Sequence, residues 1–192
     1  MSTKASKQFT PFCLYTAVAL ILGAASALGE GLSKAFIFVL LASGLLSWGL
    51  IEYALHRFIF HLDAGSISGR KVVYAAHLSH HENPKSTDSL FASLQISAPI
   101  AAGYWLLAWA VLGTWRAASY LFIGLIAGYF CYEWLHFQAH HRKPRLRLFR
   151  YLKKYHLMHH YRTPGLRFGV TSPLFDLVFR TLRPAAVVNR PG

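Results

Sequence analysis

The stretch AFIFVLLASGLLSWGLIEYALHRFIFH, residues 35–61, carries no charged side chain before Glu52 and ends in a pair of histidines. A helix needs about 20 consecutive apolar residues to cross the hydrocarbon core of a bilayer. Residues 35–55 provide that length. The stretch therefore predicts a transmembrane helix, with His56 and His61 emerging at one of its ends.

Three further apolar stretches have a similar length, at residues 11–29, 94–113 and 117–137. The last two are connected through the short segment GTWRA, which leaves room only for a tight turn. The chain is 54% hydrophobic, whereas globular chains average roughly 45–50%, and its mean hydropathy is +0.33. These features predict an all-α integral membrane protein with four transmembrane helices, and its 192 residues suit a single domain.

The first apolar stretch has a second interpretation. Lys4 and Lys7 precede it, and it ends in the small residues Ala25, Ser26 and Ala27, as a cleaved signal peptide does. The apolar run is longer than the usual signal core of about 7–15 residues. We therefore favour a retained span, with a cleaved signal over residues 1–27 as the alternative.

The basic residues predict the orientation, because cytoplasmic loops are enriched in Lys and Arg. With the N-terminus inside, only Lys34 and Arg116 of the 20 Lys and Arg side chains fall in the outer loops, residues 30–34 and 113–117. Both termini are then cytoplasmic, and the net charge of +13 faces anionic lipid head groups. We expect no nucleic-acid binding, because the basic residues lie directly beside the spans.

All eleven histidines occur in four clusters: HRFIFH (56–61), HLSHH (77–81), HFQAHH (136–141) and YHLMHHY (155–161). In the predicted topology, every cluster lies on the cytoplasmic face of the membrane. Positions i, i+3 and i+4 of a helix share one face. Each His-x-x-His-His triplet is therefore expected to aim three rings at one point, and His136 and His140 to do likewise.

The pair His56 and His61 fits this pattern less well. Five residues correspond to about 140° around an α-helix, so the two rings serve one centre only if the helix frays or if there are two centres. Imidazole is a good ligand for iron, zinc, copper and nickel. A structural zinc site needs only about four ligands, so this many histidines indicates two metal ions with four or five ligands each.

Other kinds of metal site do not fit the residues. A carboxylate-bridged di-iron bundle needs several Glu-x-x-His pairs, and only Glu133 with His136 has that spacing. The chain has no Cys-x-x-Cys pattern, and its thiols, Cys13 and Cys131, lie in apolar spans. A non-enzymatic membrane metal-binding protein is an alternative. The near absence of ionisable residues inside the spans argues against a metal transporter.

The segments EYALHRFIFH, HLSHH, YEWLHFQAHH and YHLMHHYRTPGLRFGVTSPLFDLVFRTL resemble the fatty acid hydroxylase/sterol desaturase superfamily of membrane di-iron enzymes. They are most similar to fatty acid 2-hydroxylases, over residues 50–183. The resemblance implies four transmembrane helices under a cytosolic helical cap, residues 56–93 and 138–183, that holds a dinuclear metal site. It also implies O2-dependent hydroxylation of a lipid acyl chain.

The resemblance assigns the metal ligands: His56, His61, His77, His80, His81, His136, His140, His156, His159 and His160. It places His141 beside the ligands, outside the coordination sphere. The implied cofactors are two iron ions, for which zinc is able to substitute in purified protein, and O2 is the co-substrate. The implied partners are a membrane lipid substrate and a separate electron donor, a b-type cytochrome or a ferredoxin-like protein.

Carotenoid ring hydroxylases have similar histidine boxes and are the alternative, together with lipid or sterol desaturases of the same superfamily. The chain also departs from the pattern of its relatives. The segment HHENPKSTDSLF lacks the usual arginine, Arg167 stands where glycine is common, and Phe175 stands where tryptophan is common. These differences affect the choice of lipid rather than the metal ligands.

Three acidic residues lie near the predicted ligands. Glu52 precedes His56 by one turn and Glu133 precedes His136, so each carboxylate is placed to accept a ring N–H and fix the tautomer. Asp176 is expected to cap a helix or to do the same. Residues 142–160 alternate apolar and basic side chains, which predicts an interfacial amphipathic helix. Its basic face suits lipid head groups or an acidic redox partner.

Overall fold

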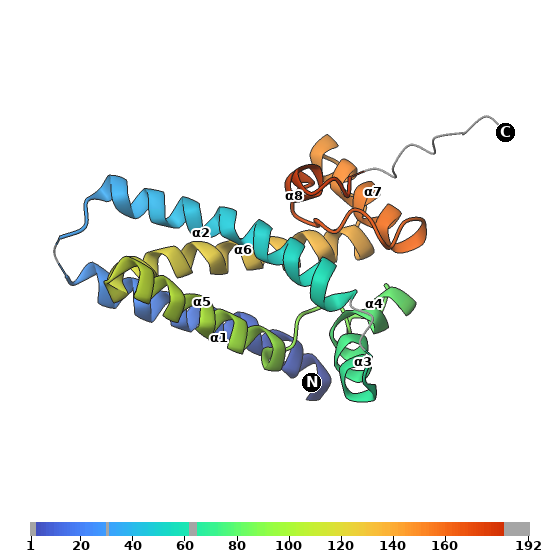
Figure 1. Cartoon of the computed structure of the whole chain (residues 1–192), viewed down its shortest axis with the longest axis horizontal. Coiled ribbons are helices and arrows are strands. Elements are labelled where there is room, and N and C mark those ends of the chain that lie inside the picture. Colours follow the sequence, from blue (N-terminus) through green and yellow to red (C-terminus); the bar gives the residue numbers. More distant parts are fainter. Residues whose placement is uncertain (1–2, 30, 62–64, 183–192) are drawn as a thin grey trace.

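The computed structural model describes residues 3–29, 31–61 and 65–182, and these residues form helices and their connections without a β-strand. Four long helices lie side by side as a bundle: α1 (Thr3–Ala27), α2 (Lys34–Ala54), α5 (Leu94–Leu112) and α6 (Trp115–His141). Figure 1 shows the shorter helices gathered at one end of this bundle. The all-α prediction is therefore confirmed for the described chain.

The four predicted spans are confirmed as helices. Segments Phe9–Ala27, Lys34–Phe60, Leu94–Leu112 and Trp115–His141 are each long and apolar enough to cross a membrane, which indicates an integral membrane protein. With 27 residues, α6 is about 40 Å long, whereas the hydrocarbon core is about 30 Å thick. Helix α6 is therefore longer than a single span requires, and its last turns carry His136 and His140.

Helix α6 is the central element, because it packs against α1, α2, α5 and α7. Its closest neighbour is α2, and the contact depends on small residues. A Cβ atom on Gly44 would lie 1.9 Å from the Leu121 carbonyl oxygen, and one on Gly124 would lie 2.1 Å from the Leu41 carbonyl oxygen. The outward faces of the bundle expose large apolar side chains, such as Leu20 and Phe38, as lipid contact requires.

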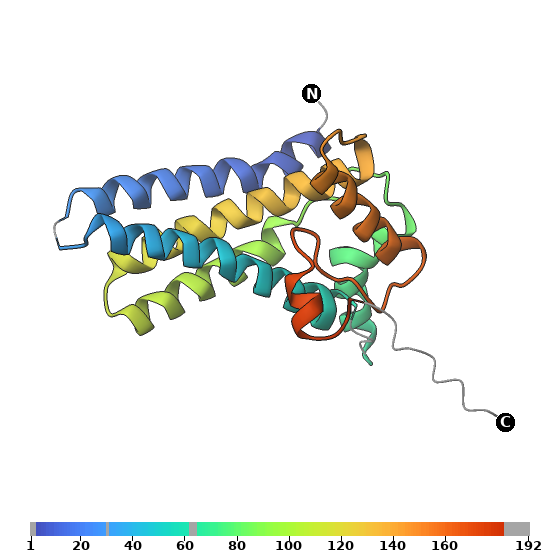
Figure 2. The ribbon, with the colours of Figure 1, turned by 90° about the horizontal axis from the view of Figure 1, so that it is seen from above.

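Six short elements form a cap at the end of the bundle where α2 and α6 finish, as Figures 1 and 2 show. They are the π-helices η1 (Leu55–Phe60) and η2 (Tyr74–Leu78), and the α-helices α3 (Ile67–Val73), α4 (Ser79–Glu82), α7 (Arg147–Tyr161) and α8 (Leu174–Val178). Helix α7 is amphipathic, as predicted. Its Lys153 ammonium donates to the carbonyl oxygens of Ala139 (2.5 Å) and Arg142 (2.8 Å), which ties α7 to the end of α6.

Candidate metal centre

The structure gathers ten of the eleven histidines into two groups where the cap meets the end of α6. In each group, the five ligand nitrogens lie within 4.8 Å of one another. The His56 group contains His56, His61, His77, His81 and His159, and the His136 group contains His80, His136, His140, His156 and His160. The rings of His81 and His160 stack at 4.1 Å between centroids, so the two groups are direct neighbours.

A π-helix explains how His56 and His61 join the same group. Residues 55–60 form η1 at the end of α2, and a π-helix places positions i and i+5 in successive turns of one face. The two ring centroids are 5.1 Å apart. For this pair, the sequence allowed either a frayed helix or two separate centres. Instead, the wider turn of η1 brings both rings into one group.

The prediction that each His-x-x-His-His triplet aims at one point is wrong. His77 and His81 belong to the His56 group, whereas His80 belongs to the His136 group. The second triplet divides the other way. His156 and His160 belong to the His136 group, and His159 belongs to the His56 group. Positions i+3 and i+4 differ by about 100° around a helix. Each triplet therefore gives an i, i+4 pair to one group and its remaining ring to the other.

The distances between ring nitrogens match ligands of a shared ion. In the His56 group, the Nε2 atoms of His77 and His81 are 2.9 Å apart, and those of His61 and His159 are 3.1 Å apart. Two nitrogens at about 2.1 Å from one ion and about 90° apart lie about 3.0 Å from each other, whereas tetrahedral ligands lie about 3.4 Å apart. Separations of this size are compatible with nitrogens that share one metal ion.

The same spacing recurs in the His136 group. The Nε2 atom of His140 lies 3.1 Å from that of His80 and 2.9 Å from that of His156, and His156 lies 3.0 Å from His160. Other ring nitrogens are buried without a hydrogen-bond partner among the described residues, including Nε2 of His56 and both nitrogens of His136. Such atoms are costly unless something binds them, and a metal ion fits that requirement.

Burial keeps the cap imidazoles in their neutral form. It lowers the pKa of His61 and of His80 to about 4, and that of His159 to about 3. It also lowers the pKa of His77 and His156 well below the usual value. A neutral imidazole offers a lone pair to a metal ion, so the protonation state of these rings suits coordination.

Backbone carbonyl groups, which the sequence did not single out, orient two of the rings. Nδ1 of His56 donates to the Phe168 carbonyl oxygen at 2.5 Å, and Nδ1 of His159 donates to the Leu166 carbonyl oxygen at 2.7 Å. Each bond leaves Nε2 with its lone pair directed at the His56 group. The only sequence signal was the segment RFGVTS, which carried part of the family resemblance.

The expectation that acidic residues hold the rings directly is not met. Glu52 and Asp176 accept hydrogen bonds from the backbone of residues 168–171 rather than from imidazoles. Glu133 accepts the Ala92 N–H at 3.0 Å and so ties α6 to the segment just before α5. His141 lies outside both groups, and its ring stacks on Phe137 at 4.9 Å.

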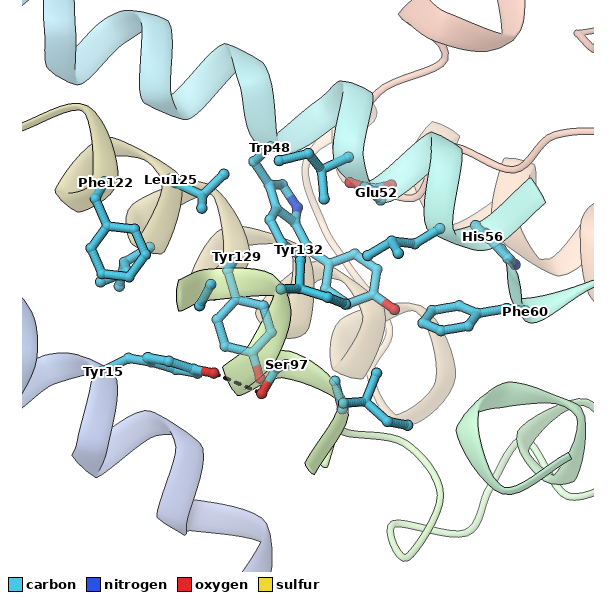
Figure 3. Close-up of a pocket in the computed structure, with 17 residues that line it drawn as sticks. Tyr15, Trp48, Glu52, His56, Phe60, Ser97, Phe122, Leu125, Tyr129 and Tyr132 are labelled. Carbon is cyan, nitrogen blue, oxygen red and sulfur yellow. Dashed lines mark hydrogen bonds between the residues drawn. The ribbon is translucent and has the colours of Figure 1, made fainter. Parts of the chain in front are cut away.

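An apolar pocket leads from the middle of the bundle to the His56 group. Figure 3 shows His56 and Phe60 at one end of this pocket and Phe122 at the other, with Tyr129 and Tyr132 between them. Helices α1, α2, α5 and α6 all contribute to its wall, which is apolar along most of its length. An extended hydrocarbon chain lying here would reach the histidines with one end.

Comparison with known proteins agrees with this geometry. Residues 41–181 match the model of the family described as fatty acid hydroxylase. The chain belongs to the fatty acid hydroxylase family. Most of its length is covered by the match, and that length includes all ten clustered histidines.

Two relatives of this fatty acid hydroxylase family member, one from a plant and one from yeast, are similar to most of the chain. The chain is 37% identical over 153 residues to the dihydroceramide fatty acyl 2-hydroxylase FAH2 of Arabidopsis thaliana, covering 80% of this chain and 64% of that protein. It is 37% identical over 169 residues to the ceramide very long chain fatty acid hydroxylase SCS7 of Saccharomyces cerevisiae, covering 84% of this chain and 42% of SCS7. The chain thus spans less than two thirds of the length of these relatives.

A solved structure of the fatty acid hydroxylase family has the same fold. It is titled full-length scs7p with only the hydroxylase domain visible, and it is 34% identical with a TM-score of 0.81. The match covers 91% of this chain and 65% of that one. Arg167 has a φ of 63°, a backbone conformation that glycine adopts without steric cost.

Proposed function

We propose that this protein is an oxidoreductase that hydroxylates a lipid acyl chain at C2 with O2, at a dinuclear iron centre held by the two histidine groups. The two five-histidine groups beside an apolar pocket carry this proposal. The family membership supports it, and the names of the plant and yeast relatives suggest an acyl chain in amide linkage as the substrate class. One oxygen atom enters a C–H bond, the other leaves as water, and an external donor supplies the electron pair.

The donor set supports iron as the resident metal. Imidazole ligands suit iron, and they also hold zinc, which is able to replace iron during purification. When bound, the iron pair supplies the O2-dependent cleavage of an unactivated C–H bond. The protein residues bind the ions, orient the lipid and exclude water. His56, which contributes to both the His56 group and the pocket wall, is the residue where the acyl chain meets the metal.

The pocket determines which carbon is attacked. Phe122 lines one end of the pocket, and His56 and Phe60 line the other. The methyl end of the acyl chain is proposed to lie toward Phe122 and its carbonyl end toward His56. A polar head group then remains at the membrane surface, where it needs no desolvation. The apolar wall around Tyr129 and Tyr132 excludes water from the chain.

The chain is proposed to act as one membrane domain with the cap and the metal centre on the cytoplasmic side. The distribution of basic residues supports this orientation. The electron donor is proposed to bind the basic groove formed at the end of α6 and along α7 by Lys143, Arg150, Lys154 and Arg162. None of the described residues that line this groove is acidic, so the groove favours an acidic protein.

Lipid mass spectrometry tests the proposal. Cells expressing the protein are expected to accumulate acyl lipids that have gained one oxygen atom, with fragmentation placing the hydroxyl group at C2. His160→Ala removes a clustered ring and should abolish this product. The matched control, His141→Ala, removes a ring outside both groups and should retain it.

Three outcomes would contradict the proposal. If the hydroxylated lipid persists in His160→Ala, the two histidine groups are not the site of the reaction. A product that has lost two hydrogens instead would identify a desaturase. A hydroxyl group on a carotenoid ring rather than an acyl chain would identify the other enzyme class.

A further inference from the structure

The rings of the two histidine groups are held by different means. In the His56 group, the carbonyl oxygens of Phe168 and Leu166 accept the Nδ1–H groups of His56 and His159. Both carbonyl groups belong to residues 166–171, here called the brace loop. Because the loop fixes two of the five rings, any residue that holds the loop also holds those rings.

Asp176 secures the first half of the brace loop. Its carboxylate accepts the backbone N–H of Phe168 at 2.9 Å and that of Gly169 at 2.7 Å. The Thr181 hydroxyl donates to the same carboxylate at 2.7 Å. Asp176 is completely buried, and hydrogen bonds to a carboxylate are roughly twice as strong as neutral ones. Because Asp176 holds the backbone N–H of Phe168, it also fixes the Phe168 carbonyl group that accepts the His56 Nδ1–H.

Glu52 secures the second half from the opposite side. Its carboxylate accepts the backbone N–H of Val170, the backbone N–H of Thr171 at 3.0 Å, and the Thr171 hydroxyl at 2.5 Å. Glu52 belongs to α2, one turn before His56. Four consecutive backbone N–H groups of the loop thus end on two carboxylates.

The His136 group has no comparable support among the described residues. The Nδ1 atoms of His80, His136, His156 and His160 are buried there without a hydrogen-bond partner. These rings are held by packing, as in the stacking of Tyr132 on His136 at 5.5 Å. Their tautomers and orientations are therefore less constrained than those of His56 and His159.

We propose that the two groups bind metal with unequal affinity, that the His56 group is the tighter and is filled first, and that Asp176 and Glu52 are positioning residues for it through the brace loop. A hydrogen bond at Nδ1 holds the ring in place and strengthens its donor nitrogen. Loss of such a partner typically weakens metal binding about 10–100-fold. The proposal rests on the metal site proposed above.

Titration of the metal-free protein in nanodiscs with Co2+ or Zn2+, against a competing chelator, tests the inequality. Wild-type protein should bind one ion tightly and one at least about tenfold more weakly. His61→Ala should remove the tight class, and His140→Ala should remove the weak class. Two ions of equal affinity, or loss of the tight class in His140→Ala, would overturn the proposal. Binding of no ion would instead refute the metal site itself.

Substitution of the positioning residues tests their role. Asp176→Asn should weaken the tight class at least about tenfold and leave the weak class unchanged. Glu133→Gln is the matched control, because Glu133 is an equally buried carboxylate that binds Ala92 instead of the brace loop. Thr171→Val removes one hydroxyl contact to Glu52 and should shift the tight class in the same direction. If Asp176→Asn does not fold, this milder variant tests the positioning role in its place. Equal weakening of both classes of metal binding would contradict that role.

Discussion

Two arginines adopt a left-handed backbone conformation, Arg167 with a φ of 63° and Arg180 with a φ of 59°. This conformation costs a residue with a Cβ atom about 1–2 kcal/mol. Arg167 recovers part of that cost, because it is largely buried and donates to the Thr163 hydroxyl at 2.5 Å. Arg180 is exposed, so the conformational cost there is offset less.

Arg180→Gly is expected to raise the free energy of unfolding by about 0.5–1 kcal/mol, since glycine adopts positive φ without steric cost but gains entropy in the unfolded chain. The same substitution at Arg150, exposed near the start of α7, should lower it by about 1 kcal/mol. Thermal unfolding followed by tryptophan fluorescence measures both. Shifts of the same sign would contradict the structural assignment at Arg180.

The histidines that cluster were predictable from the sequence, but the groups that orient them were not. Histidines at ligand spacing identify themselves by residue type, and the structure brings all ten predicted ligands into two groups. The acceptors of the Nδ1–H groups are backbone carbonyl groups of Leu166 and Phe168, which every residue possesses. Glu52 was predicted to accept a ring N–H because it lies one turn before His56. Its actual partners are backbone N–H groups from a distant segment, which the sequence does not reveal.

At the scale of elements, the long helices were predictable because bilayer thickness sets their length, whereas the π-helices were not. Segments η1 and η2 insert an extra residue into a helical turn, and no residue type specifies that insertion. The wider turn in η1 accompanies the convergence of His56 and His61 in one group. Sequence periodicity alone therefore misjudged the geometry of this pair.

The contact between α2 and α6 matters for the site because α2 leads into His56 and α6 carries His136. Gly124→Ala would place a Cβ atom 2.1 Å from the Leu41 carbonyl oxygen and force the helices apart. Overpacking of this kind costs about 1–3 kcal/mol, so we expect a lower unfolding temperature and weaker metal retention. Thermal unfolding and metal analysis of the purified protein measure the two effects.

Gly103→Ala provides the control within the bundle. A Cβ atom on Gly103 in α5 meets no atom of the described residues within 4 Å, and alanine favours a helix over glycine by about 1 kcal/mol. This variant should be as stable as wild type or more stable, with unchanged metal content. If Gly103→Ala and Gly124→Ala lower the unfolding temperature and the metal content equally, overpacking at the α2–α6 contact does not explain the losses.

At the scale of the whole molecule, the basic groove predicts how the electron donor binds. Lys154→Glu reverses an exposed charge in the groove, and Lys85→Glu makes the same change elsewhere in the cap. Lys154→Glu should slow reduction by an acidic donor several-fold at low ionic strength, whereas Lys85→Glu should have a smaller effect. The difference should disappear at high salt because of screening. Stopped-flow reduction measures these rates, and equal slowing by both variants would place the donor elsewhere.

The asymmetry of charge along the bundle also predicts the orientation in the membrane. Lys34 and Arg116 lie at the end opposite the cap, while the cap, α7 included, and its connecting segments carry most of the other basic residues. In a background without Cys13 and Cys131, Thr114→Cys should react with a membrane-impermeant maleimide on intact cells. Lys143→Cys, at the cap end, should react only after permeabilisation, because translocating the clustered Lys and Arg residues is opposed by the positive-inside bias. The reverse labelling pattern would place both histidine groups outside, away from a cytoplasmic electron donor.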